Sequence, residues 1–80
     1  MNLGQAIAQR ANELLSKSGK TQYRVAKEMT ISQNTMTNMV NGKTKKTNLP
    51  TLFLFCRALN ISVDEFFSDP IFADPTLEID

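Results

Sequence analysis

The chain has 80 residues, which suffice for one small domain but not for two cores, and no apolar run approaches the roughly 20 residues of a membrane span. It contains no His and a single Cys, so it lacks the commonest general base and metal ligand and cannot form an internal disulfide or a Cys-rich zinc site. The net charge of +1 conceals an uneven distribution: residues 1–50 carry eight Lys or Arg against two Glu, whereas residues 51–80 carry one Arg against six acids. This asymmetry favours a polyanion as the partner of the basic part. The alternative is chance clustering of charges on a solvated surface.

The spacing of apolar residues, and the capping residues between them, predict five helices and no strand, so we expect an all-α fold. The predicted helices cover residues 3–17, 22–29, 33–40 and 49–59, followed by a short fifth helix that ends near Ser68. Thr21, Ser32 and Asn48 stand where N-caps are needed. Ser62 and Glu65 have the spacing of a capping box at the start of the fifth helix.

The apolar faces of these helices supply a single core. We expect it to contain Leu14, Val25, Met29, Ile31, Met36, Met39, Leu52, Cys56, Leu59, Val63 and Phe66. Within an apolar helix, the lone Cys is predicted to be a small core residue rather than a redox sensor. After a domain that spans residues 1–68, residues 69–80 hold two Pro and four acids and are predicted to form an extended acidic tail.

The second and third helices are joined by only three residues, 30–32, and a link that short makes two helices cross steeply, as in a helix-turn-helix. Ala26 provides the small residue that the crossing requires. The apolar residues expected inside the corner are Val25, Met29, Ile31, Met36 and Met39. Because the spacing fits across the whole of residues 22–41, we predict a helix-turn-helix rather than a generic helical hairpin.

The outer face of the third helix is made of amides and hydroxyls. Its residues, which share one stripe, are Gln33, Asn34, Thr37, Asn38 and Asn41. Asn and Thr are poor helix formers, so this face lowers helix propensity, but its groups both donate and accept hydrogen bonds, as base edges in a major groove require. An ordinary uncharged polar face is the alternative, and the corner and the basic flanks favour DNA readout.

The segment from Thr21 to Phe67 resembles the lambda-repressor-like helix-turn-helix family, also called the Cro or XRE family, and the match extends over residues 3–67. The matching parts are Gln22, Ala26, Ser32, Asn41-Gly42-Lys43 and the segment ALNISVDEFF at 58–67. The resemblance implies a compact five-helix DNA-binding domain. The sequence departs from the family pattern at two places. Thr30 stands where Gly is usual and would be strained at a positive φ. The loop 43–48 is about two residues longer than in compact phage repressors.

The resemblance also implies roles for individual residues. Gln22 would contact a phosphate, while Gln33, Asn34 and Asn38 would read bases, with Thr37 beside them. The loop after the third helix would contact the DNA backbone through Asn41, Lys43, Lys45 and Lys46. The sequence leaves open whether Tyr23 and Arg24 reach phosphate or are simply solvated.

We therefore expect a transcriptional repressor that binds double-stranded DNA at an inverted repeat, with an antitoxin-like or accessory protein-interaction module as the alternative. The N-terminus does not resemble a signal peptide, so we expect a cytoplasmic protein, not an enzyme, that needs no cofactor and no metal. A homodimer is predicted through the fourth and fifth helices and the tail, with Leu54 facing solvent. The alternative is that Ile71 and Phe72 fold back and cover Leu54, which leaves a monomer that dimerises only on DNA.

Overall fold

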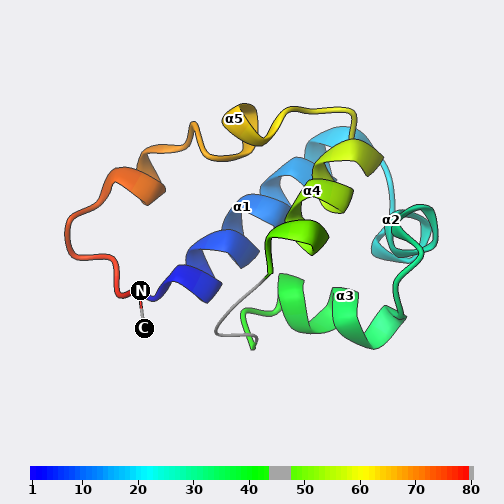
Figure 1. The fold of residues 1–80 in the computed structure, drawn as a ribbon, viewed down its shortest axis with the longest axis horizontal. Helices are drawn as coiled ribbons and strands as arrows, with labels where there is room; N and C mark the ends of the chain where they lie inside the picture. The colour runs from blue at the N-terminus through cyan, green and yellow to red at the C-terminus, as the bar shows by residue number, and fades with distance from the viewer. Residues whose placement is uncertain (44–47, 80) are drawn as a thin grey trace.

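The computed structural model describes residues 1–43 and 48–79, and these residues form an all-α fold, as predicted (Figure 1). The helices are α1 (Leu3–Ser18), α2 (Gln22–Met29), α3 (Gln33–Val40), α4 (Leu49–Ala58) and α5 (Val63–Phe66), followed by a short 3-10 helix, η1 (Pro70–Ala73). Within the described ranges, the only β-structure is one isolated parallel bridge between Asn2 and Glu78. The predicted bounds hold to within one or two residues, and α5 ends at Phe66 rather than near Ser68.

The predicted N-caps all form. The side chains of Thr21, Ser32 and Asn48 each accept a hydrogen bond from the backbone N–H three residues later. At Ser62 the hydroxyl accepts from the Glu65 backbone at 3.1 Å, but the contacts of the described residues do not include the return bond from the Glu65 side chain. The predicted capping box is therefore only half formed, whereas a complete one, which sequence analysis missed, closes at the start of α1 between Asn2 and Gln5.

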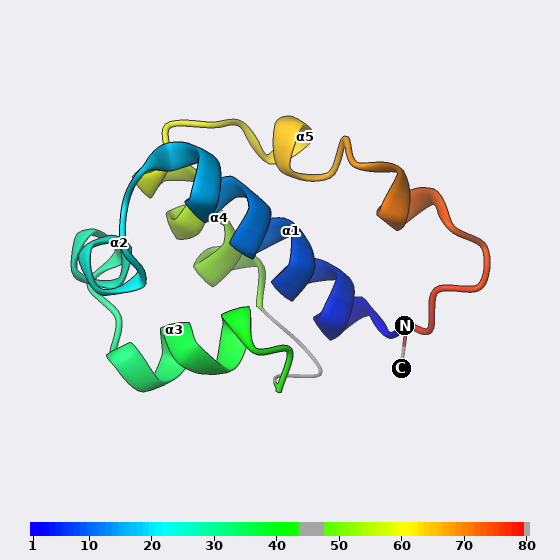
Figure 2. The ribbon, with the colours of Figure 1, turned by 180° about the vertical axis from the view of Figure 1, so that it is seen from behind.

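The arrangement of the helices separates two edges of the molecule. Figures 1 and 2 show α3 along one edge and α5 along the opposite edge, with α1 and α4 between them. The core lies among α1–α5, and its largest fully buried side chains are Phe55, Phe66, Met36, Leu52, Val25 and Cys56. Most of the predicted core is confirmed, but Ile31, Leu59 and Val63 are only half-buried, and Ile7 and Phe55 belong to the core instead.

The segment after α5 differs from the extended tail that its composition predicts. Asp69 caps η1 by accepting from the Ile71 N–H at 2.9 Å, and the Phe72 ring lies 4.8 Å from that of Phe67. Further on, Glu78 is hydrogen-bonded to the backbone of both Met1 and Leu3, so the two ends of the described chain lie together. The segment folds back because Phe72 finds aromatic partners in Phe66 at the end of α5 and in Phe67 just after it, which the Pro and acidic residues of the segment do not reveal.

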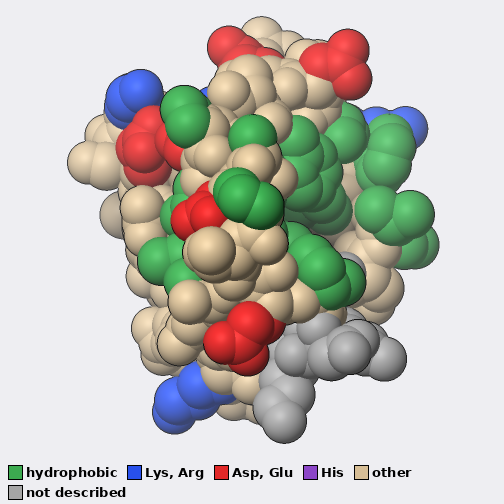
Figure 3. Space-filling view, turned by 90° about the vertical axis from the view of Figure 1, so that its left-hand side faces the viewer, with side chains coloured by type: hydrophobic (Ala, Val, Ile, Leu, Met, Phe, Trp, Pro, Cys, Tyr) green, Lys and Arg blue, Asp and Glu red, His purple; other side chains and the backbone are tan. Residues whose placement is uncertain are grey.

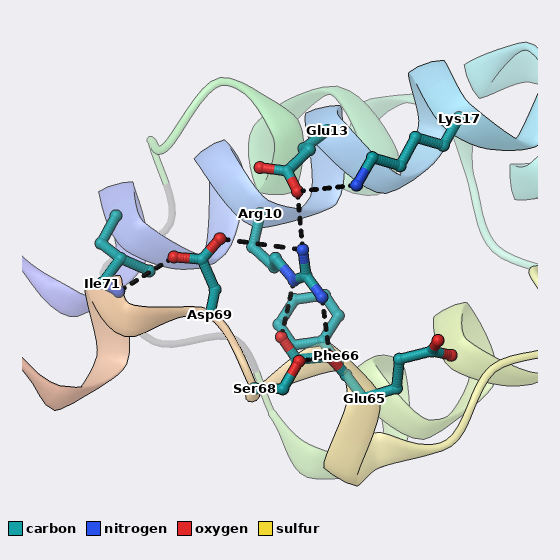
Figure 4. Close-up of polar contacts among 8 residues, drawn as sticks. All are labelled: Arg10, Glu13, Lys17, Glu65, Phe66, Ser68, Asp69 and Ile71. Atoms are coloured by element: carbon teal, nitrogen blue, oxygen red, sulfur yellow. Dashed lines mark hydrogen bonds and ion pairs between the residues drawn. The ribbon is translucent and has the colours of Figure 1, made fainter.

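One buried cation fastens α5, and with it the start of the following segment, to α1. Arg10 is only 8% exposed and donates from Nε to the Phe66 carbonyl (2.8 Å) and from Nη2 to the Glu65 carbonyl (2.7 Å). Its Nη1 contacts Glu13 at 2.7 Å and lies 3.7 Å from Asp69 (Figure 4). Arg10 thus satisfies the free carbonyls at the end of α5, and its charge is directed into the protein rather than towards a polyanion.

Candidate nucleic-acid interface

The corner between α2 and α3 has the predicted geometry. Ala26 is fully buried at the crossing, and its carbonyl accepts a hydrogen bond from the Ile31 N–H at 3.1 Å. Thr30 adopts φ 58° and ψ 41°, the left-handed conformation that is costly for a β-branched residue. The chain therefore forms the usual turn despite the Thr, instead of taking a different local path.

The polar face of α3 points away from the core. Met36, Met39 and Val40 are buried on its inner side, while Gln33, Asn34, Thr37 and Asn41 are exposed and Asn38 is half-buried. At the end of α3, Gly42 has φ 70°, and a Cβ there would lie 3.5 Å from the Gln5 backbone of α1. The positive φ, rather than a lack of space, is what calls for Gly at position 42. The outer face of α3 presents amides and hydroxyls to solvent, with Asn38 the half-buried member of the row.

The structure brings the starts of α2 and α3 together. Gln22 is exposed at the first position of α2, and the Gln33 side chain donates from Nε2 to the backbone carbonyl of Tyr23 at 3.2 Å. The predicted phosphate contact and the first predicted base contact therefore lie on adjoining elements. Sequence analysis did not find this bond, because it depends on how closely the two helices approach.

Beyond α3, the predicted backbone-contact loop is only partly described. Asn41 and Lys43 are exposed, and the Lys43 N–H donates to the Asn38 carbonyl at 3.1 Å. Lys45 and Lys46 lie outside the described residues, so their roles stay predictions.

Several cations of the N-terminal part are engaged within the protein. Lys20 donates from Nζ to Glu28 at 2.9 Å and to the Ala58 carbonyl at 2.7 Å, and the Nε of Arg24 lies 3.3 Å from Glu28. The hydrogen bond from Lys20, together with the charges of Lys20 and Arg24, lowers the pKa of Glu28 despite some desolvation. With Arg10 also buried, fewer cations face outward than the charge balance of residues 1–50 indicates.

Large apolar side chains are exposed outside the helix-turn-helix. On α4, Leu49 is 64% exposed and Phe53 47%, whereas Leu54, predicted to face solvent, is half-buried against the core. The expectation for Leu54 was wrong because the apolar run 52–56 points all round the helix, and only the packing of α4 decides which residue faces outward. Figure 3 shows apolar side chains gathered, with acidic ones among them, on the side of the molecule that is on the left in Figure 1.

Two further findings concern the described part of the chain. No three His, Cys, Asp or Glu residues there are grouped so that they could hold a metal ion. None of its helices combines the length and the apolar character that a membrane crossing requires.

Comparison with known proteins gives one match. A family model described as a Cro/C1-type helix-turn-helix DNA-binding domain matches residues 12–70, well over half of the chain, and includes all of α2 to α5. No curated protein and no solved structure matches the chain significantly.

Proposed function

The chain belongs to the Cro/C1-type helix-turn-helix family of DNA-binding domains, and from this premise we propose that it is a cytoplasmic transcriptional repressor that reads an operator with α3. The exposed row of amides and hydroxyls on α3 is the observation that carries the proposal. A Gln or Asn amide can bond the N6 and N7 of an adenine together, and the neighbouring hydroxyls can bond to either a donor or an acceptor. The proposal assigns no catalytic step to the protein and no cofactor.

Contacts to the DNA backbone would fix the orientation of α3 in the groove. Gln22 at the start of α2, and Asn41 and Lys43 after α3, are exposed at the two ends of the helix-turn-helix. Such contacts position a reading helix without carrying sequence information. A domain that occupies a promoter in this way excludes polymerase by steric overlap alone, which is why we propose repression.

We further propose that the operator is an inverted repeat bound by a homodimer. One helix-turn-helix reads only a few base pairs, too few for specificity among the many competing sites of a genome, whereas two copies about 34 Å apart read successive turns of one groove. The exposed Leu49 and Phe53 on α4 favour α4 as part of the dimer surface, together with α5 and the segment after it. In this proposal Phe53, rather than Leu54, is the apolar residue at the centre of the contact between the two subunits.

The same apolar side chains favour one alternative, an antitoxin-like or accessory module whose main partner is another protein. A large exposed aromatic residue such as Phe53 is suited to either kind of protein contact. The two functions differ in what the isolated protein does with DNA. A repressor binds its operator without a partner, whereas an accessory module does not.

A selection of binding sites from random duplex DNA, using the purified protein alone, tests the proposal. We expect enrichment of a short inverted repeat whose half-sites are one helical turn apart, and protection of that repeat from nuclease. A selected pool that binds no better than random DNA would contradict sequence-specific reading. Enrichment of a single half-site would support reading by α3 but contradict the homodimer.

A further inference from the structure

The α2 residue that accepts the Gln33 bond has an exposed side chain next to the start of α3. The Tyr23 side chain is 60% exposed, and its backbone carbonyl lies 3.2 Å from the Gln33 Nε2. A Tyr side chain combines an apolar ring with a polar hydroxyl, so an exposed one is suited to a contact with a partner. Its position beside the first predicted base-reading residue indicates where that contact would be.

A cation is held at the same place. The Lys27 Nζ lies 5.4 Å from the centroid of the Tyr23 ring, one helical turn further along α2. This arrangement is a cation–π interaction, which restrains the ammonium group without neutralising it. Among the described residues, no carboxylate lies within ion-pair distance of Lys27, so its charge stays available to an external anion.

The neighbouring stripe of α2 is different. Arg24 and Glu28 are also one turn apart, but they pair with each other, and Glu28 pairs in addition with Lys20, which is tied to the Ala58 carbonyl of α4. Successive residues of a helix are about 100° apart around its axis, so the two stripes face different directions. One stripe of α2 therefore carries an available cation beside α3, and the other carries cations that are balanced internally.

From these contacts we infer that Tyr23 and Lys27 form an additional phosphate-binding contact, which flanks Gln33 when α3 enters the groove; this inference rests on the proposed DNA binding. A Tyr hydroxyl and a Lys ammonium both donate to phosphate oxygens, and the first helix of a helix-turn-helix crosses the DNA backbone. Arg24 and Lys20 do not take part, because Glu28 holds them.

The test compares two variants that each remove one positive charge from α2, Lys27→Gln and Arg24→Gln. Affinity for the selected operator is measured between 50 and 200 mM salt. In the proposed homodimer, Lys27→Gln removes one phosphate contact from each subunit. Each contact contributes about 0.9 to the slope of log affinity against log salt, so the slope should fall by about 1.8, and the decrease in affinity over this range should become about twelvefold smaller. Arg24→Gln should keep the wild-type slope, because that side chain contacts no phosphate in the complex.

A third variant, Tyr23→Phe, keeps the ring under Lys27 and removes only the hydroxyl. It should weaken binding to operator and random DNA by the same factor, since a phosphate contact carries no sequence information. Equal slopes for Lys27→Gln and Arg24→Gln, or unchanged binding by Tyr23→Phe, would overturn the inference. Failure of the wild-type protein to bind DNA at all would instead contradict the proposed function on which it rests.

Discussion

Replacing Thr30 by Gly should stabilise the protein, although it removes a side chain from the turn at the centre of the DNA-binding motif. Thr30 is exposed, and its side chain makes no hydrogen bond among the described residues. The turn is held instead by backbone bonds, from the Thr30 N–H to the Lys27 carbonyl and from the Ile31 N–H to the Ala26 carbonyl, both 3.1 Å long. A Gly at position 30 retains both of these bonds.

The magnitude follows from the backbone conformation. At φ 58° a non-Gly residue is strained by about 1–2 kcal/mol, and a β-branched residue lies at the upper end of that range. Gly loses about 0.4–1 kcal/mol more backbone entropy on folding, which opposes this gain. The free energy of unfolding should therefore rise by about 1 kcal/mol, which corresponds to about 4–8 °C in Tm for a domain of this size.

Asn60 provides a matched control, because it has the same φ of 58° in another exposed turn. Asn tolerates this conformation far better than Thr, so Asn60→Gly should change stability by only a few tenths of a kcal/mol. Urea unfolding followed by circular dichroism measures both variants. If Thr30→Gly were no more stabilising than Asn60→Gly, strain at Thr30 would not be what sets the stability of the turn.

Arg10→Met should lower the free energy of unfolding in urea by about 3 kcal/mol, because the Phe66 and Glu65 carbonyls lose their donor. Lys17→Met, on the same helix, should change the free energy of unfolding by less than about 0.5 kcal/mol. Equal effects of the two substitutions would refute the anchoring role of Arg10. In analytical ultracentrifugation, Phe53→Glu should convert the proposed dimer into a folded monomer, while Leu54→Glu, at a half-buried position, should mainly destabilise the subunit. A wild-type protein that is monomeric at high concentration would contradict the proposed dimer surface. Because the pKa of Glu28 is lowered in the folded state, its ion pairs stabilise the fold above the ordinary value of 4.5 and are lost as the pH falls below it. Glu28→Gln should therefore lose less stability than the wild type between about pH 5 and pH 3, and parallel pH profiles would refute this account.

The helices and the corner could be predicted from the sequence because their signals are local. Thr21, Ser32 and Asn48 act as caps within three residues of where they stand, and the link at residues 30–32 fixes the crossing by its length alone. The polar face of α3 could be predicted for the same reason, since helical periodicity decides which of its residues lie opposite Met36 and Met39.

What could not be predicted depends on contacts between distant parts of the chain. Arg10 counts as a surface charge in the sequence, and only the approach of Phe66, 56 residues later, makes it a buried anchor. The folded-back segment after α5 likewise depends on Phe72 meeting Phe67. In the candidate site, the bond between Gln33 and the Tyr23 carbonyl follows from the distance between two helices, which neither helix encodes by itself.

The central claim, that α3 reads base edges, is tested most directly by the affinity of Gln33→Ala for the selected operator and for random duplex DNA. Gln9→Ala, an exposed Gln on α1, is the control and should leave both affinities unchanged. Gln33→Ala should weaken operator binding by about 1–3 kcal/mol, relax the preference at one base position of each half-site, and leave binding to random DNA nearly unaltered. Equal losses on operator and random DNA would show that Gln33 does not read a base and would contradict the placement of α3 in the groove.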